Sequence, residues 1–182
     1  ILCYAGIHEI HPNGKLIREL MPAYKSGNQL EQQLLQFDIN MVTPIIKKSA
    51  LDRFKVNFNE DIYSSEEYNL FMRLAAKGDF CSVQKVLGVW RISPGSFTDQ
   101  LAEKNGPDRE LTLKQLKEEN PGIENQFSIA FKEAYSRGKY YYARSHVMNG
   151  NHFYAIKLMK SISKVSIYYK LLYYSLFVPF LW

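Results

Sequence analysis

The chain has 182 residues, of which 46% are hydrophobic, and a formal net charge of +5. This length and hydrophobic content exclude a disordered chain and suffice for one domain with a buried core plus an appendage. The two cysteines, Cys3 and Cys81, lack a metal-ligand spacing, so we expect reduced, buried thiols in a cytosolic protein rather than a disulfide scaffold.

The first part of the chain predicts a β-hairpin and a short helix. Leu2 to Ile7 and Leu16 to Leu20 have the composition of strands, and Pro12-Asn13-Gly14 between them is a strong hairpin signal. Residues 28–37 follow as a short amphipathic helix, with Asn28 as its expected N-cap. A β-branched strand is then predicted from Met41 to Lys47, before a helical turn.

An acidic loop precedes the most informative helix of the chain. This helix begins with two adjacent carboxylates, Glu66 and Glu67. Apolar residues then recur at helical spacing and predict one buried stripe, formed by Leu70, Phe71, Leu74 and Ala75. Glu67 lies one turn before this stripe, so its side chain starts on the same inward face.

Two interpretations of Glu67 follow from the local sequence. Ser64 and Glu67 have the S-x-x-E spacing of a capping box, in which the glutamate carboxylate accepts from the amide of the N-cap serine. Acidic residues also favour the first turn of a helix because the helix dipole is positive there. Alternatively, a carboxylate at the end of a buried stripe is placed to meet a ligand.

A long strand is expected after this helix. The helix is predicted to end at Lys77-Gly78, with a basic last turn and a glycine cap. Phe80 to Arg91 reads as a strand, and residues 93–96, Ser-Pro-Gly-Ser, read as a turn. The elements up to residue 98 predict an α/β fold with a mixed sheet flanked by helices.

The character of the chain changes beyond Thr98. Residues 99–122 are predicted as a charged helical linker, interrupted near residues 105–107 and broken at Pro121-Gly122. Residues 123–182 predict an all-α helical hairpin plus a tail. The hairpin resembles one tetratricopeptide-like unit, with Gly150 at the turn and Ala143 and Ala155 at the close contact between helices. A single such unit does not bury its own face.

The tail from Ile162 to Trp182 is rich in tyrosine, leucine and phenylalanine. Its uncharged run after Lys170 has 12 residues and includes Pro179, which is too short to span a bilayer. One interpretation is an amphipathic helix at a membrane interface, with aromatic side chains at the boundary and lysines at the headgroups. The other is that the aromatic residues complete the core of the hairpin.

The charge is unevenly distributed. From Ser128 to the end there are eight Lys or Arg residues and one acid, Glu133, giving +7, so the rest of the chain carries −2. A basic, aromatic C-terminal part indicates an anionic surface as its partner, most simply a membrane. No nucleic-acid motif accompanies the charge, so nucleic acid is not expected as a partner.

Three segments, in this order, carry a resemblance to a known family. They are Phe58-x-x-x-Ile62, the run E-E-Y-N-L-F-M-R-L-A at residues 66–75, and V-L-x-x-W-R-I-x-P-G-S at residues 86–96. Together they resemble the second half of a family 2 glycosyltransferase with the GT-A fold. The upstream residues Ala5-Gly6, the segment from Ile10 to Lys15 and residues 39–51 fit the same pattern. The resemblance covers residues 1–98.

The resemblance assigns roles to several residues. In this family the second acid of the helix motif is the general base, which corresponds to Glu67, with Glu66 beside it. Glutamate stands here where the family has aspartate, and either length allows a carboxylate to reach a hydroxyl. Arg73 is implied only as a supporting residue. The implied substrate-binding residues are Arg91, Asn40, Thr43, Asp61 and Ser93, and Ser93 stands where the family has histidine.

The resemblance also implies parts that these 182 residues do not contain. Family members hold a divalent cation, Mg²⁺ or Mn²⁺, and a nucleotide-sugar donor on a D-x-D-type motif, and this sequence has no D-x-D. We therefore expect a fragment of an inverting glycosyltransferase, inactive alone and without metal ligands of its own. The acceptor would be a saccharide or a lipid-linked glycan in surface polysaccharide synthesis, and the protein cytoplasmic or peripheral on the inner face of the membrane. The alternative is a non-catalytic binding or scaffold module that acts through the C-terminal helices.

Overall fold

The computed structural model describes residues 1–96 and 100–178, which form two compact units. Of the described residues, the first unit contains 1–61 and 66–96, and the second contains 62–65 and 100–178. The first unit combines strands and helices, whereas the second is helical. The predicted fold class is thus confirmed as mixed α/β with a helical C-terminal part.

The described residues of the first unit form a mixed four-stranded sheet around the buried strand β1 (Leu2–Ile10). Strand β4 (Phe80–Arg91) pairs parallel with the whole of β1. Strand β2 (Leu16–Leu20) pairs antiparallel with residues 7–10 of β1, and β3 (Ile45–Ile46) pairs antiparallel with residues 2–3. Both therefore lie on the edge of β1 that β4 leaves open. The predicted hairpin is confirmed, since the amide of Gly14 donates to the carbonyl of His11 between β1 and β2.

The predicted strand from Met41 to Lys47 is wrong for most of its length, because only Ile45–Ile46 pairs with β1. The side chain of Asn40 accepts from the amide of Val42 at 3.0 Å, which turns the chain instead of extending it. Pro44 has no amide hydrogen to donate to a neighbouring strand. Local side-chain bonding therefore overrides β propensity in this segment.

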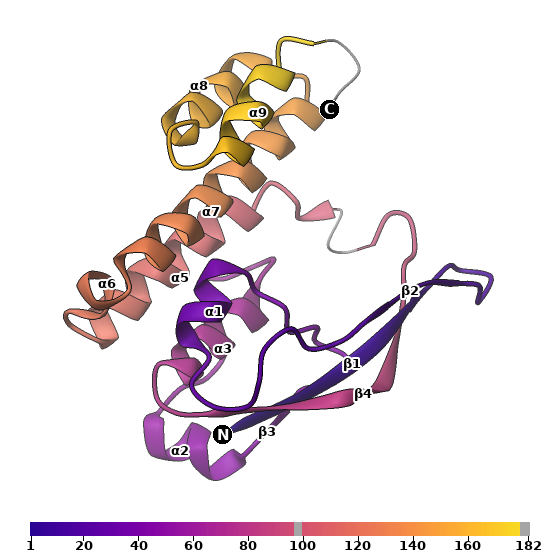
Figure 1. Ribbon diagram of the computed structural model, residues 1–182, viewed down its shortest axis with the longest axis vertical. Coiled ribbons are helices and arrows are strands. Elements are labelled where there is room, and N and C mark those ends of the chain that lie inside the picture. The colour runs from indigo at the N-terminus through magenta and orange to yellow at the C-terminus, as the bar shows by residue number, and fades with distance from the viewer. Residues whose placement is uncertain (97–99, 179–182) are drawn as a thin grey trace. The chain divides into compact units, whose positions relative to one another are not determined.

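The helices α1 (Leu30–Leu35) and α3 (Glu66–Ala75) contact each other and lie over one face of the sheet (Figure 1). Helix α2 (Lys48–Phe54) follows β3. The predicted apolar stripe of α3 is confirmed, but every residue from Tyr68 to Ala75 is buried, so α3 is a central helix rather than an amphipathic surface helix. The predicted glycine cap is wrong, because Gly78 does not adopt a left-handed conformation.

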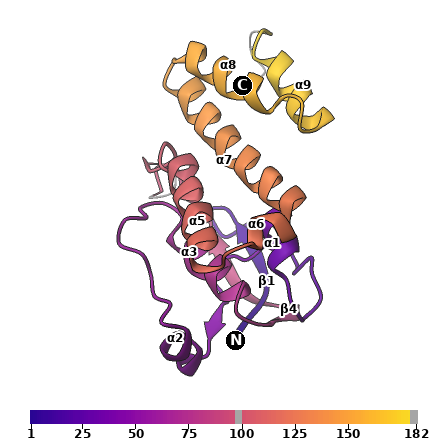
Figure 2. The ribbon, with the colours of Figure 1, turned by 90° about the vertical axis from the view of Figure 1, so that its left-hand side faces the viewer.

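The second unit consists of helices connected by short turns (Figure 2). Helix α5 (Asn105–Glu119) is followed by the single turn α6 (Ile123–Gln126), and α7 (Ser128–Met148) returns along α5. Helix α8 (His152–Ile162) packs onto α7, and α9 (Ile167–Ser175) packs onto α8. The interruption expected near residues 105–107 is the start of α5, with Pro107 in the first helical turn, where proline is tolerated.

The hairpin predicted around Gly150 is present as α7 and α8. Gly150 has a φ of 75°, a left-handed value that glycine adopts without strain. Ala143 and Ala155 are fully buried in one hydrophobic cluster, together with Met159, Ile162 and Tyr169. The segment predicted as a linker, residues 99–122, contains α5, which packs along α7 within the second unit.

The two cysteines lie opposite each other on β1 and β4, since Cys3 is in register with Cys81. Both are free, but the expected burial is wrong for both, since Cys3 is only half-buried and Cys81 is exposed. The C-terminal part of β4 is exposed along much of its length, because β4 has only one partner strand in the described sheet. Over residues 1–96 and 100–178, no helix has both the length and the apolar composition required to cross a membrane.

Candidate functional site

The two carboxylates predicted as the catalytic pair open helix α3. Glu66 and Glu67 occupy its first turn, where both side chains are half-buried. Burial raises the pKa of the Glu67 carboxyl above its ordinary value, and the neighbouring charge of Glu66 acts in the same direction. A hydrogen bond from the main-chain N–H of Glu67 to its own side chain partly offsets this rise. The carboxyl group is therefore a stronger base than an exposed glutamate.

The capping-box interpretation of Glu67 is wrong. The amide of Ser64, which a capping box would direct to Glu67, donates instead to Oδ2 of Asp108 at 2.7 Å. The hydroxyl of Ser64 bonds to the same oxygen at 3.0 Å, and the amide of Tyr63 donates to it at 2.9 Å. Since the Ser64 amide is taken by Asp108, the reciprocal bond of a capping box does not form, and the Glu67 side chain accepts from its own amide instead.

Arg73 fastens the loop that precedes α3 to the helix itself. Its Nη1 donates to the carbonyl oxygen of Asn57 at 3.0 Å and to Oδ1 of Asn69, one turn earlier, at 3.5 Å. The Arg73 side chain is buried, and guanidinium bonds of this kind hold backbone segments in place. Arg73 therefore braces α3 and the loop before it, which fits the supporting role that the resemblance implied.

Two of the predicted substrate-binding residues form bonds that shape the backbone. The hydroxyl of Thr43 donates to the carbonyl of Ala5 at 3.0 Å and accepts from the amide of Ala5 at 3.1 Å, so it takes the place of a strand partner beside β1. Asn40 supports the adjacent turn through Val42. These bonds give both residues a structural role, and their contact with a substrate stays a prediction.

The other three predicted substrate-binding residues are exposed. Arg91 ends β4 and donates from Nη1 to the carbonyl oxygens of Pro12 at 2.9 Å and His11 at 3.3 Å, so it holds the turn of the β1–β2 hairpin. Asp61 and Ser93 have exposed side chains in loops. Among the described interactions, none joins Arg91, Asp61 or Ser93 to Glu67, so no contact links these residues into one site.

A polar network in the first unit was not predicted. The carboxylate of Asp38 accepts from Nε2 of Gln33 at 2.6 Å, from the amide of Ala23 at 2.7 Å and from the hydroxyl of Tyr4 at 3.2 Å. Burial, followed by the charge of Asp38, raises the pKa of Tyr4. Gln29 completes the network by accepting from the Tyr4 hydroxyl. The members are up to 34 residues apart in sequence, so no local pattern marks them.

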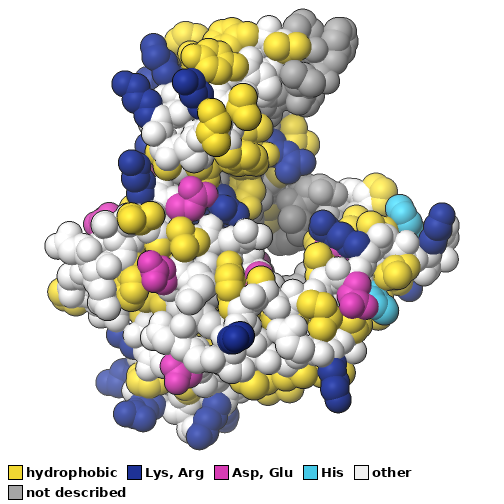
Figure 3. Space-filling model, viewed as in Figure 1, with side chains coloured by type: hydrophobic (Ala, Val, Ile, Leu, Met, Phe, Trp, Pro, Cys, Tyr) yellow, Lys and Arg dark blue, Asp and Glu magenta, His cyan; other side chains and the backbone are white. Residues whose placement is uncertain are grey.

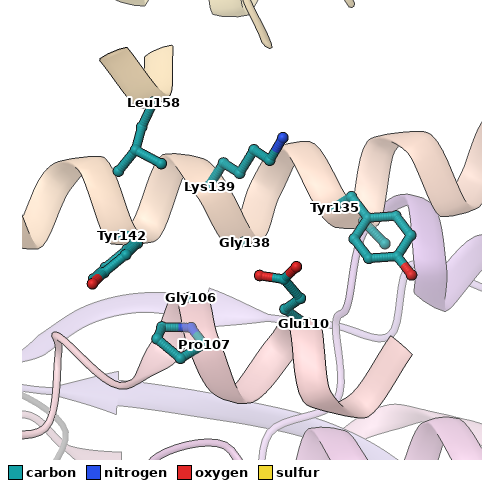
Figure 4. A pocket seen from close by; sticks show the side chains of 9 residues that line it. Gly106, Pro107, Glu110, Tyr135, Gly138, Lys139, Tyr142 and Leu158 are labelled. Carbon is teal, nitrogen blue, oxygen red and sulfur yellow. The ribbon is translucent and has the colours of Figure 1, made fainter. Parts of the chain in front are cut away.

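The three described cavities are lined by residues of the second unit. One, of about 180 Å³, lies in the second unit beside the contact of α5 with α7, and Gly106 and Gly138 are among its lining residues (Figure 4). Tyr135, Tyr142 and Glu110 line it together with Pro107, Ala134, Lys139 and Leu158. A second cavity lies beside α9 and a third along α7. Glu66 and Glu67 line none of these three cavities.

The described residues do not form a metal site. Within residues 1–96 and 100–178, no group of three or more histidine, cysteine, aspartate or glutamate side chains is arranged to hold a metal ion.

The chain was compared with protein-family models, with curated proteins and with solved structures. None of the three comparisons found a match.

Proposed function

We propose that this chain is the acceptor-side part of an inverting glycosyltransferase of the GT-A type and that Glu67 is its general base. The observation that carries the proposal is the state of Glu67. It is a half-buried carboxylate at the start of a central helix, its pKa is raised, and the Ser64 amide that a capping box would direct to it donates to Asp108 instead. The ordered resemblance of residues 1–98 to family 2 glycosyltransferases supports the same assignment.

The proposed reaction uses Glu67 to accept one proton. The acceptor hydroxyl gives its proton to the carboxylate of Glu67 while its oxygen forms a bond to the anomeric carbon of the donor sugar. The bond between that carbon and the diphosphate breaks, and the nucleoside diphosphate leaves with the bonding electrons. Because attack and departure occur on opposite faces, the configuration inverts. A base with a raised pKa favours this step, since proton transfer is most efficient when the pKa approaches the working pH.

The proposal assigns different tasks to the surrounding residues. Glu66 raises the proton affinity of Glu67 through its charge. Arg73 and the backbone bonds of Thr43, Asn40 and Arg91 hold the neighbouring loops. Asp61 and Ser93, whose side chains are exposed, are the candidates for direct contact with acceptor hydroxyls.

The proposal requires a donor-binding half from outside these 182 residues. That half would bind the nucleotide-sugar and the Mg²⁺ or Mn²⁺ ion. The acceptor would be a saccharide or a lipid-linked glycan used in surface polysaccharide synthesis. We propose a cytoplasmic location for the protein, on the inner face of the membrane.

The experiment compares Glu67→Gln with Glu66→Gln in a protein that contains both halves. Glutamine keeps the shape of the side chain but does not accept the proton. We expect Glu67→Gln to lower kcat about 10²- to 10⁴-fold, the usual contribution of a general base. Glu66→Gln, a substitution of the same kind at the neighbouring position, is expected to lower it far less. Equal activity of Glu67→Gln and the wild type would refute the base assignment.

One observation favours the second candidate, a binding module that acts through the C-terminal helices. Several large apolar side chains of α9 are exposed, although the opposite side of this helix is packed. The two candidates differ in their response to Glu67→Gln. A binding module keeps all of its function in this variant, whereas the enzyme loses its activity.

A further inference from the structure

Helix α9 has two apolar faces, of which the body of the second unit covers one. Tyr169 is fully buried in the cluster of α7 and α8, and Leu172 and Tyr173 pack against the same cluster. The hydroxyl of Tyr169 also donates to Oε1 of Glu133 at 2.7 Å, and Glu133 pairs with Arg137 at 3.0 Å. These contacts attach α9 firmly to α7, so its orientation within the second unit is defined.

The opposite face of α9 is apolar and exposed. Ile167, Leu171 and Tyr174 have the spacing i, i+4, i+7 and lie along one side of the helix. Their exposed fractions are 70%, 63% and 55%. Tyr168 in α9 and Phe177 and Val178 just after its last residue are also exposed, and together these six residues are called the outer face of α9. Exposed apolar side chains that lie along one side of a helix mark a candidate interaction site.

Lysines border this apolar surface, and acidic residues are absent. From Asn149 to the end the sequence contains four lysines, at positions 157, 160, 164 and 170, and no aspartate or glutamate. Lys164 and Lys170 line a groove of about 570 Å³ beside α9, together with Ser163, Ser166, Tyr173 and Tyr174. On the face in view in Figure 3, hydrophobic and basic side chains lie side by side over α8 and α9. The groove therefore combines two ammonium groups with hydroxyl donors, which suits a phosphate ester.

These observations favour one partner for the outer face of α9 over the other. A second copy of the chain would bring lysines against lysines, which is unfavourable. An anionic membrane satisfies both components, since its acyl chains accept the apolar side chains and its headgroups accept the lysines. A nine-residue helix is also suited to lie in the plane of the interface rather than to cross it.

We propose that the outer face of α9 inserts into the surface of an anionic phospholipid membrane and that the groove with Lys164 and Lys170 binds a lipid headgroup phosphate. Tyrosine and lysine side chains then lie at the depth where the hydrocarbon region meets the headgroups. The packed face of α9 does not change on binding, because Tyr169 and Leu172 stay in the core. Lipid binding is independent of sugar transfer, so Glu67→Gln leaves it intact.

The experiment measures co-flotation of the 182-residue chain with two kinds of vesicle, of phosphatidylcholine alone and of phosphatidylcholine mixed with phosphatidylglycerol. The wild type is expected to float with the mixed vesicles and not with phosphatidylcholine, and flotation is expected to decrease with added salt. Equal flotation with both kinds of vesicle, or with neither, would overturn the proposal.

Two variants separate the contributions of charge and apolar insertion. Lys164→Gln/Lys170→Gln is expected to weaken binding about 25-fold, since each lysine near an anionic surface contributes about fivefold. Leu171→Asp removes an inserted side chain and adds a repelled charge, and it is expected to abolish flotation. The matched controls are Lys48→Gln/Lys114→Gln and Met41→Asp, which change exposed residues outside α8 and α9 and are expected to bind like the wild type.

Two further measurements test whether misfolding of a variant or self-association of the chain explains a change in flotation. All substituted side chains are exposed, so circular dichroism is expected to show the wild-type helix content in every variant. Light scattering in the absence of vesicles is expected to give the mass of one chain. A dimer that Leu171→Asp dissociates would assign the outer face of α9 to a second copy of the chain and overturn the lipid proposal.

Discussion

Helices α5 and α7 contact each other at two glycines, and alanine at these two positions is expected to have opposite effects. A Cβ atom at Gly106 would lie 2.6 Å from Cβ of Tyr142 and 2.8 Å from the carbonyl oxygen of Gly138. At Gly138 the nearest atoms to an added Cβ, Cδ of Arg109 and the carbonyl oxygen of Gly106, are 3.5 Å away. The first substitution therefore creates a clash with backbone, whereas the second creates an ordinary contact.

The distances set the magnitude of each effect. Carbon atoms pack at about 3.5–4.0 Å, so Gly106→Ala requires the two helices to separate by about 1 Å. Overpacking of this kind costs about 1–3 kcal/mol. Gly138→Ala meets no such obstacle and gains helix propensity of about 0.8–1 kcal/mol. We therefore expect the first variant to be less stable than the wild type and the second to be more stable.

Thermal unfolding followed by circular dichroism measures the difference. For a unit of this size each kcal/mol corresponds to a Tm change of about 4–8 °C. Because the chain has two units, amide hydrogen exchange of α5 and α7 peptides identifies which of them is affected. A Gly106→Ala protein with an unchanged or raised Tm, or a shift of both variants in the same direction, would refute the packing of α5 against α7.

The remaining predictions concern two side chains with altered environments. Because the folded state raises the pKa of Glu67, the folded protein binds more protons than the unfolded one, and stability falls as pH rises from the ordinary value of 4.5 through the folded pKa. Glu67→Gln is thus expected to raise the free energy of unfolding at pH 7 and to lose this advantage below pH 4.5. Urea titrations of the variant and the wild type at both pH values measure this effect. An equal difference in unfolding free energy between the two proteins at both pH values would contradict the buried state of Glu67. Tyr169→Phe removes the bond to Glu133 and is expected to cost about 1.5–3 kcal/mol, the range for hydrogen bonds to charged groups. The exposed Tyr174→Phe is its control, and similar thermal shifts in both variants would exclude this anchor of α9.

Several regular elements of this protein were determined by its local sequence. The limits of β4, the hairpin at Pro12-Asn13-Gly14 and the helical turn at Gly150 follow from patterns and turn residues within a few positions. The buried stripe of α3 follows from helical spacing in the same way. Such features depend on contacts between near neighbours in the chain, which the sequence displays directly.

The tertiary structure alone decided where the polar groups bond. The carboxylate of Asp108 takes the amide of Ser64 from 44 residues away, so the capping box that the spacing predicted does not form. Thr43 bonds to Ala5 across 38 residues and replaces an expected strand, and Tyr169 selects which side of α9 is buried. A hydrogen-bonding group accepts any partner of suitable geometry, so its choice depends on which segments the fold brings within about 3 Å.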